Sequence, residues 1–438
     1  MNSIVFRRIV YITFIIIFLV VAPLIVLYTM GYRYNFTKGR VQKTGILKIT
    51  SVPRGADIYL NGVKYALSQT PAKIKYLLPG DYEIKLSKSG YHDWGKKLAV
   101  YDNGTTFAEK ILLWKQSSLE ALTAISTPSW LVSPDKNIVA LNDDQGNVSL
   151  LDINSGLFGE ISGGNIGLID NLTEKNLRLS AFSPSGRYLL AQTEADQYYL
   201  IDTISKNDKK IEDRNFLSVK WDTDNDNLYG LNKTGVWQIN LNSLKANIIS
   251  KTLADDFYIS QKTLYLLSQG AISRQDLGGQ DGSEEITKLN CDNNCRIKMI
   301  TGSKIFVANM ANQDLFIIDL NRQIKTISAK AKGIDWLNDN SLIFYNDFEL
   351  YIYDFAKDSP ELITRLGTRI NFAVWHPQGK HIFFSTDNKI KIIELDNREL
   401  RNTIDLAEAP ANFMAIDRAG NNLYYAVDKS GIFKLNIQ

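Results

Sequence analysis

Few side chains in this 438-residue chain have the types and spacing that acid–base or nucleophilic catalysis requires. There are three histidines, and two of them, His376 and His381, lie within one copy of a repeated segment that explains them structurally. The chain contains no Gly-x-Ser-x-Gly elbow, His-Glu-x-x-His pair, Walker loop or Gly-x-Gly-x-x-Gly turn. We therefore expect no catalytic residues and no cofactor, and the chain is predicted not to be an enzyme.

Two other groups of residues could bind a metal ion. Asp222, Asp224 and Asp226 alternate as in a calcium loop, but Asn227 and Lys233 stand where that loop needs Gly and Glu. We expect a tight turn there and no metal site.

Cys291 and Cys295 are the only cysteines, and they flank a short polar turn. Zinc would need two further ligands, and no paired His or Cys stands nearby in the sequence. A small disulfide loop is expected if this part of the chain lies outside the cell, and two free thiols otherwise.

The N-terminal segment from Ile9 to Tyr32 contains no charged residue. As a helix it would rise about 36 Å, which is enough to cross a bilayer with some tilt. A cleaved signal peptide has a shorter apolar core, so we predict an uncleaved transmembrane helix at residues 9–32 after a short cytoplasmic tail at residues 1–8. Membrane lipid is therefore one expected partner.

Two arguments bear on the orientation of this helix in the membrane, and they point in opposite directions. Four basic residues follow the helix within the next eleven positions, whereas only Arg7 and Arg8 precede it. Because basic flanks tend to stay on the cytoplasmic side, this charge difference alone favours a cytoplasmic location for the rest of the chain. Large domains are translocated largely regardless of flanking charge. Together with the resemblance described next, this favours a single-pass protein of the cell membrane whose bulk is extracytoplasmic.

Residues 33–43 are predicted to be a linker, and residues 44–115 are predicted to form a small β domain. In this domain, Asn61-Gly62 is expected to form a type I′ hairpin turn and Pro79-Gly80 another turn. Its motifs are SVPRGA at 51–56, YLNG at 59–62, TP at 70–71, LPGDY at 78–82 and GYHDW at 90–94. In this order they resemble a PEGA domain, although Arg54 stands where the name-giving motif has Glu.

The resemblance implies a small extracellular β-sandwich of surface proteins, with a spacer or wall-proximal role and no catalytic residues. Within it, Tyr91 and Trp94 are candidates for stacking on a sugar ring or on a partner's apolar patch. In so small a domain, packing of these rings in the core is the preferred interpretation.

Residues 116–438 contain a repeat with a period of about 40 residues, seen best in AFSPSGRYLL at 181–190 and AVWHPQGKHIFF at 373–384. Eight units begin near Trp130, Ala181, Val219, Phe257, Ile297, Gly333, Ala373 and Phe413. Several short strands per unit at this period predict the blades of a β-propeller. Eight blades are expected, with seven as the alternative, and the motif resembles WD40-like propellers of the TolB type.

The predicted fold class is therefore all-β with one N-terminal transmembrane helix, a PEGA-like sandwich and a propeller. Basic and acidic residues number 15 and 6 in residues 33–115, but 33 and 41 in residues 116–438. The basic part suits anionic lipid or anionic wall polymer, and no nucleic-acid motif accompanies it.

We expect a membrane-anchored cell-surface protein, of a bacterial type, whose propeller binds an unknown protein or envelope polymer. Two alternatives are structural cell-wall anchoring through the basic PEGA-like domain, and a propeller enzyme such as a glycosidase or lyase. The enzyme would need carboxylates or histidines that converge at the starts of the blades.

Overall fold

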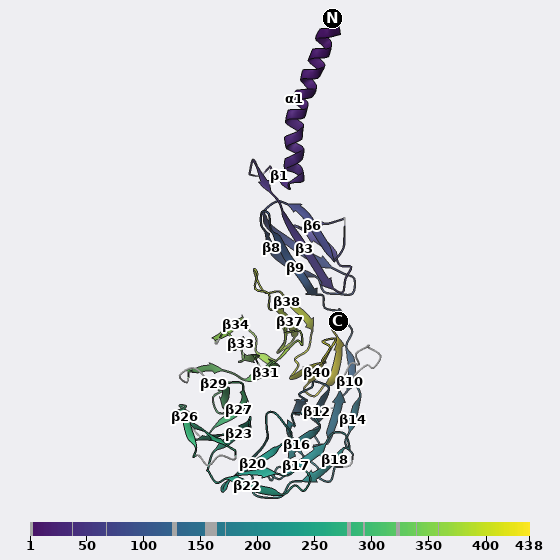
Figure 1. Cartoon of the computed structure of the whole chain (residues 1–438). Coiled ribbons are helices and arrows are strands. Elements are labelled where there is room, and N and C mark those ends of the chain that lie inside the picture. Colours follow the sequence, from purple (N-terminus) through teal and green to yellow (C-terminus); the bar gives the residue numbers. More distant parts are fainter. Residues whose placement is uncertain are drawn as a thin grey trace. The chain divides into compact units, whose positions relative to one another are not determined.

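The computed structural model describes residues 3–438 except 37, 67, 125–128, 154–163, 171, 278–281, 292–293, 321–324, 339 and 358. It divides into two compact units. The first unit holds residues 1–116 with residues 396–402 and Gln438, and the second holds residues 117–395 and 403–437. Strands dominate both units, as Figure 1 shows.

The one helix in the described part of the chain is α1 (Ser3–Thr29), which contains Pro23. Its stretch Phe6–Thr29 is long and apolar enough to cross a membrane by length and composition, and its large apolar side chains are exposed. The helix ends three residues before the predicted end at Tyr32. Gly31, at φ 85°, turns the chain out of the helical direction immediately afterwards.

The segment predicted as a linker, residues 33–43, contains a hairpin that the sequence did not predict. Its strands are β1 (Tyr32–Asn35) and β2 (Arg40–Lys43). The guanidinium of Arg33 lies 3.6 Å from the ring centre of Tyr28, and its Nη1 donates to the Tyr28 carbonyl at 2.8 Å. This cation–π and hydrogen-bond contact holds the hairpin against the end of the helix, because it joins the two elements directly.

The rest of the first unit is a sandwich of two small sheets, with strand orders β6-β3-β9 and β5-β4-β7-β8. The strands are β3 (Gly45–Val52), β4 (Asp57–Leu60), β5 (Val63–Lys64), β6 (Ala72–Leu77), β7 (Gly80–Ser87), β8 (Trp94–Val100) and β9 (Thr105–Leu112). Alternate residues of β3, including Leu47 and Ile49, are buried in the core, as the period of two in a strand requires. The predicted hairpin turn joins β4 to β5, with both Asn61 and Gly62 at positive φ.

Motif residues that are far apart in the sequence meet in this sandwich. The hydroxyl oxygens of Ser51 and Thr70 lie 2.6 Å apart, and the backbone N–H of Ala56 donates to the Thr70 hydroxyl at 2.9 Å. These polar groups are buried, so their mutual hydrogen bonds remove the cost of leaving them unpaired.

The described residues of the second unit form eight four-stranded sheets, each antiparallel and, with one exception, consecutive in sequence. Blade 1 holds β11 (Ser129–Val132), β12 (Ile138–Asn142), β13 (Val148–Asp152) and β14 (Ile166–Leu168). Blade 2 holds β15 (Arg178–Phe182), β16 (Tyr188–Gln192), β17 (Tyr198–Asp202) and β18 (Asn207–Lys210). Blade 3 holds β19 (Ser218–Trp221), β20 (Leu228–Asn232), β21 (Gly235–Ile239) and β22 (Ala246–Ser250). Blade 4 holds β23 (Asp256–Ser260), β24 (Thr263–Ser268), β25 (Ala271–Asp276) and β26 (Glu284–Lys288).

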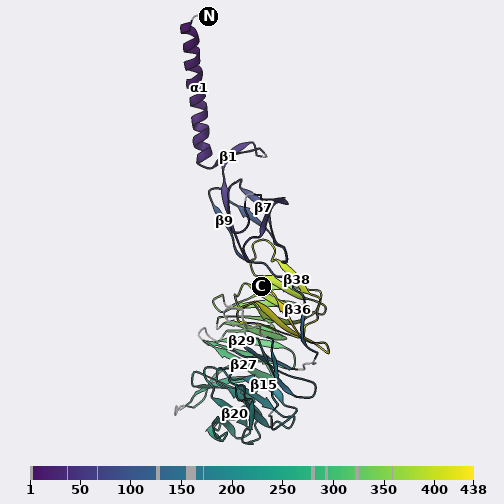
Figure 2. The ribbon, with the colours of Figure 1, turned by 90° about the vertical axis from the view of Figure 1, so that its right-hand side faces the viewer.

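The remaining four blades continue the same order around the ring in Figure 1. Figure 2 shows the molecule turned by 90°, with strands β27, β29, β36 and β38 of blades 5 and 7 labelled. Blade 5 holds β27 (Cys295–Thr301), β28 (Lys304–Asn309), β29 (Asp314–Asp319) and β30 (Lys325–Lys330). Blade 6 holds β31 (Gly333–Asn338), β32 (Ser341–Tyr345), β33 (Glu349–Asp354) and β34 (Ser359–Arg365). Blade 7 holds β35 (Ile370–Trp375), β36 (His381–Thr386), β37 (Ile390–Glu394) and β38 (Thr403–Ala407). Blade 8 holds β39 (Phe413–Ile416), β40 (Asn422–Val427), β41 (Gly431–Asn436) and, as its outermost strand, β10 (Glu120–Thr123).

Blade 8 is the exception in sequence order, and it closes the ring. Its outer strand β10 comes from the start of the unit and pairs antiparallel with β41 at the end, with Ala121 opposite Phe433. The blade then packs on blade 1, where Trp130 and Val139 share an apolar cluster with Tyr424. A closed ring leaves no blade with an uncovered face, which a single blade could not achieve by itself. The eight-blade prediction agrees with these eight sheets.

The degenerate turn motif of the repeat adopts one geometry in five blades. Its first residue is Ser133, Ser183, Asp222, His376 or Asp417, and in each turn the N–H of that residue donates to the carbonyl five positions later. In four of these turns the residue three positions on is at positive φ: Lys136, Gly186, Gly379 or Gly420. The repeat is therefore a structural turn that starts the second strand of a blade.

A candidate binding site in the propeller channel

The first strands of the blades line two neighbouring cavities, which together are called the central channel here. One has a volume of about 630 Å³ and is lined mainly by β15, β19, β23 and β27. The other has a volume of about 570 Å³ and is lined mainly by β31, β35 and β39. Met299 and Pro134 line both cavities, so the two cavities adjoin, and each is called a half of the channel.

The first half of the channel contains a group of charged side chains that is unusual for first strands. Lys220, Asp256, Arg296 and Lys298 all line it. Lys220 Nζ lies 2.7 Å from Asp256 Oδ1 and donates to Oδ2 at 2.8 Å. The backbone N–H of Ile297 also donates to Asp256 Oδ2, at 2.7 Å.

Asp256 is a structural residue as well as a charged one. Its side chain is only 1 % exposed, and its bonds to Lys220 and Ile297 join three consecutive blades. Burial lowers the pKa of Lys220, although the carboxylate of Asp256 opposes that change. Removing either partner would leave the other charge buried and uncompensated.

The second half of the channel has a carboxylate with a similar structural role. Asp335 Oδ2 accepts the backbone N–H of Trp375 at 2.8 Å, which joins blade 6 to blade 7. Burial raises the pKa of Asp335, and the positive charge of Lys136 opposes the rise. Asp256 and Asp335 line different halves of the channel, so the structure does not bring them together as an acid–base pair.

The histidines that the repeat explains are buried within blade 7, as the sequence predicts, and they do not line the channel. His376 Nε2 lies 3.2 Å from the Gly420 carbonyl, and its Nδ1 is 3.4 Å from the N–H of Gln378. Burial lowers the pKa of His376 to about 4, so the ring is neutral at pH 7.

The aspartates considered for calcium diverge rather than converge. Asp222 accepts the N–H of Asp224 within its own turn. The carboxylate of Asp224 accepts the N–H of Gln261, and Asp226 accepts the N–H of Ser185. No group of three or more His, Cys, Asp or Glu side chains suited to a metal occurs among the described residues.

The structure also places the remaining candidates from the sequence. Cys291 and Cys295 are joined by a disulfide, with their Cα atoms 6.2 Å apart. Trp94 is 4 % exposed within the core of the sandwich, and Tyr91 is half-buried against that core. These positions agree with the preferred interpretation of core packing, since the core of so small a domain needs their ring surface. Stacking of Tyr91 and Trp94 on a ligand stays a prediction.

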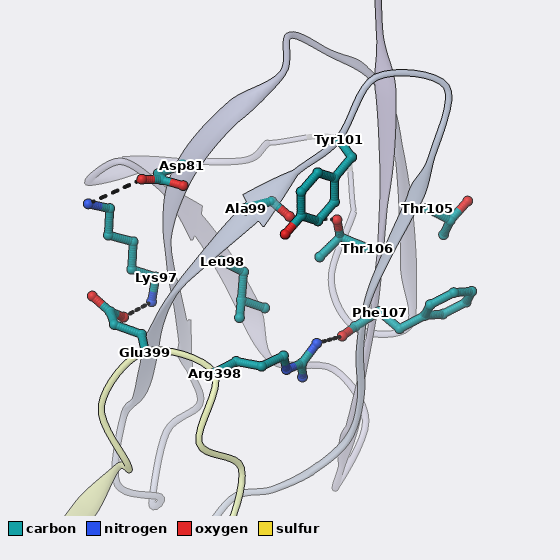
Figure 3. A pocket seen from close by; sticks show the side chains of 10 residues that line it. All are labelled: Asp81, Lys97, Leu98, Ala99, Tyr101, Thr105, Thr106, Phe107, Arg398 and Glu399. Atoms are coloured by element: carbon teal, nitrogen blue, oxygen red, sulfur yellow. Dashed lines mark hydrogen bonds and ion pairs between the residues drawn. The ribbon is translucent and has the colours of Figure 1, made fainter.

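A further hollow lies in the first unit, with a volume of about 590 Å³. Figure 3 shows that its charged side chains point toward partners. Lys97 Nζ lies 3.5 Å from Asp81, the Lys97 N–H donates to Glu399 at 2.7 Å, and Arg398 Nη1 donates to the Phe107 carbonyl at 2.6 Å. Because these charges are already compensated, the channel is the better candidate for ligand binding.

The sequence interpretation missed the channel cations, although one signal was present. Two positions before the turn residue, other blades have the apolar residues Leu131, Ala181, Val374 and Ala415, whereas blade 3 has Lys220. A charge at a position where the repeat is otherwise apolar indicates a special environment.

Comparison with known proteins agrees with the assignment of the small β domain and of the propeller. Residues 44–112 match the PEGA domain family model. No curated protein matches the chain in sequence. The WD40 domain of Sif2 is 12% identical over 74% of this chain and 99% of its own, with a TM-score of 0.51.

Two further solved structures match less closely. Sqt1 of Saccharomyces cerevisiae is 12% identical over 74% of this chain and 98% of its own, with a TM-score of 0.49. PorZ, a bacterial surface component of the type IX secretion system of Porphyromonas gingivalis, is 11% identical over 70% of this chain and 42% of its own, with a TM-score of 0.43. At these identities the likeness to Sif2 shows the propeller fold alone.

Proposed function

We propose that this chain is a single-pass membrane protein whose propeller binds a partner outside the cytoplasm and catalyses no reaction. The apolar stretch Phe6–Thr29 supports anchorage, and the PEGA domain supports an extracytoplasmic location. The propeller supports binding, because propellers commonly bind through their faces and through the loops at the ends of their blades. A fold does not itself specify an activity, so the proposal depends on the channel.

The observation that carries the proposal is the chemistry of the channel lining. Two of its carboxylates hold blades together, Asp256 through Lys220 and Ile297 and Asp335 through Trp375. The third, Asp222, holds its own turn. General acid–base catalysis needs a group that can reach a substrate proton and that has a partner to orient it. The channel instead offers cations and aromatic rings, which suit binding.

In-cell photocrosslinking of the full chain tests the binding proposal. A photoreactive amino acid at Met299, which lines both halves of the channel, is compared with the same amino acid at Ile248. Ile248 lies on the outer strand β22 and is 39% exposed, so it controls for chance encounters. We expect a discrete adduct from position 299 alone. Equal adducts at both positions, or none at position 299, would contradict binding at the channel.

A second candidate function is anchoring to an anionic wall polymer, and the charge of residues 33–115 favours it. These residues include 15 basic and 6 acidic side chains. Several of the lysines are paired with acidic neighbours, including Lys48 with Glu109 and Lys85 with Asp93. Polymer binding by the full chain would weaken steeply between about 50 mM and 200 mM salt, because exposed charges are screened. Binding at the channel that persists at 200 mM salt would separate the two functions.

A further inference from the structure

Lys298 is the least compensated of the three cations that line the first half of the channel. No hydrogen bond or ion pair engages its ammonium group within the part of the chain that the structure describes. Burial lowers the pKa of Lys298, the charge of Arg296 lowers it further, and only Asp256 among the carboxylates opposes the change. Asp256 is already engaged by Lys220 and by the N–H of Ile297.

A β-bulge sets the position of this lysine. In the pairing of β27 with β28, Ile297 is opposite Val307 and Met299 is opposite Phe306, so Lys298 is the extra residue. An extra residue in one strand bends the ladder and redirects a side chain, and such bulges are common beside functional sites. The bulge places Lys298 and Arg296 in the lining of the same cavity.

Aromatic side chains form part of the walls around these cations. Phe182, Trp221 and Tyr258 line the same cavity. Burial raises the pKa of Tyr258 to about 12, so its ring carries no charge at neutral pH. Lys220 Nζ lies 5.7 Å from the centre of that ring. A ligand for this cavity therefore combines an anionic group with apolar carbon atoms.

The charge of the whole propeller limits what the anion can be. Residues 116–438 carry 33 basic and 41 acidic side chains, so the propeller is net negative while this cavity holds three cations and Asp256 beside them. Asp222 also lines the cavity, where it holds its own turn. An extended polyanion would be repelled by the surrounding surface, whereas a single carboxylate interacts with the nearby cations at short range.

From this arrangement we infer that the channel binds an acidic peptide segment of a partner protein, whose carboxylate side chain pairs with Lys298 and Arg296 while its apolar part packs on Trp221 and Tyr258. This inference deepens the proposed function and rests on it, because it names the chemistry of the partner at the same site. A charge-assisted hydrogen bond in a partly buried site is one of the stronger polar interactions a peptide can make.

The test measures binding of two short probe peptides to the purified full chain in detergent. The peptides are N-acetyl-Trp-Glu-Gly amide and the matched N-acetyl-Trp-Gln-Gly amide, and the binding is followed by calorimetry. We expect the glutamate peptide to bind at least tenfold more tightly than the glutamine peptide. Its binding should also protect Lys298 from acylation, as read by peptide mass spectrometry.

Two variants make the test specific to the site. Lys298→Met removes the charge of a side chain that is exposed to the channel, and we expect it to abolish the preference for glutamate. Lys210→Met, at an exposed position on β18, is the matched control and should leave the preference unchanged. Thermal unfolding of both variants checks that they are folded. Lys298→Arg keeps the charge and should keep most of the preference.

Each other result would overturn the inference. Equal binding of the two peptides, or an unchanged preference in Lys298→Met, would show that the cations do not bind a carboxylate. Tighter binding of long-chain polyphosphate than of the glutamate peptide would assign the site to a polyanion instead. If the Met299 crosslink forms while the glutamate peptide has no advantage, the proposed function stands and this inference fails. If the preference is present while no crosslink forms, the site binds carboxylate but the proposed partner interaction fails.

Discussion

At the residue scale, Gly186 and Gly420 occupy the same place in two blade turns, at φ 74° and 79°, but their surroundings differ. A Cβ at position 420 would lie 2.5 Å from Nε2 of the buried His376, whereas at position 186 the nearest atom would be an Asp135 oxygen at 3.6 Å. Gly186→Ala should cost about 1 kcal/mol, the penalty of a left-handed conformation. Gly420→Ala adds overlap with a packed side chain, so we expect a loss of about 3 kcal/mol. Denaturant unfolding of both variants measures the difference, and equal losses would contradict this packing.

His376 should make the stability of the propeller depend on pH. Its pKa is about 4 in the folded chain, against an ordinary value of 6.5, because the buried ring is penalised when charged. The Gly420 carbonyl and Asp417 favour the charged form, and Lys136 opposes it. The unfolded chain therefore takes up the proton first as the pH falls. The stability contribution is fully present above about pH 6.5 and is lost between pH 6.5 and 4.

The loss over that window amounts to roughly 3 kcal/mol for this one group. His376→Ser introduces the residue found at the same turn position in Ser133 and Ser183, and it removes the titration. The unfolding free energy of the native chain should thus fall more steeply from pH 6.5 to 4 than that of the variant. Parallel profiles would mean that His376 is not held in its neutral form.

Sequence and structure agree unevenly at this scale. The turn residues and the histidines in blade 7 follow from the repeat, because local hydrogen bonds fix them. The role of Lys298 does not follow from the repeat. It depends on a bulge in β27 and on the charge of Asp256, which lies on a different blade. Spacing in one strand does not reveal which side chains of neighbouring blades share a cavity.

At the element scale, the closing strand is the feature with the clearest consequence. β10 pairs with β41 although more than 300 positions separate their first residues. Its amide protons should exchange with solvent as slowly as those of β41, because both open only when blade 8 opens. Hydrogen exchange followed by mass spectrometry compares peptides covering the two strands. Fast exchange of β10, at the rate of an unpaired segment, would show that the ring is not closed by this strand.

The elements themselves were largely predictable. The period of about 40 residues predicts the blades. The two best copies of the repeat begin in the first strands β15 and β35 and continue through the turn into β16 and β36. The hairpin of β1 and β2 was missed, because its few polar and aromatic residues show no clear alternation and it is held by the contact of Arg33 with Tyr28. The apolar segment predicted the C-terminal end of the helix to within a few residues. The helix ends just before the turn at Gly31.

At the scale of the whole molecule, the chain combines an apolar helix, a PEGA domain and an eight-bladed propeller with a cationic cavity in its channel. In the proposed function, the helix and the domain determine on which side of the membrane the propeller lies. The channel determines what the propeller binds. The sequence predicts the first two from local patterns. It could not predict the cavity, which exists only once blades 2 to 5 surround it.

Exposure of the propeller on the far side of the membrane is the central claim, and protease accessibility tests it most directly. The chain is expressed in cells with a C-terminal tag, and protease is added to the outside of the intact cells. A tagged cytoplasmic protein serves as the control. The account requires loss of the tag in intact cells while the cytoplasmic control survives. Protection of the tag until the membrane is broken would place the propeller in the cytoplasm and contradict the account.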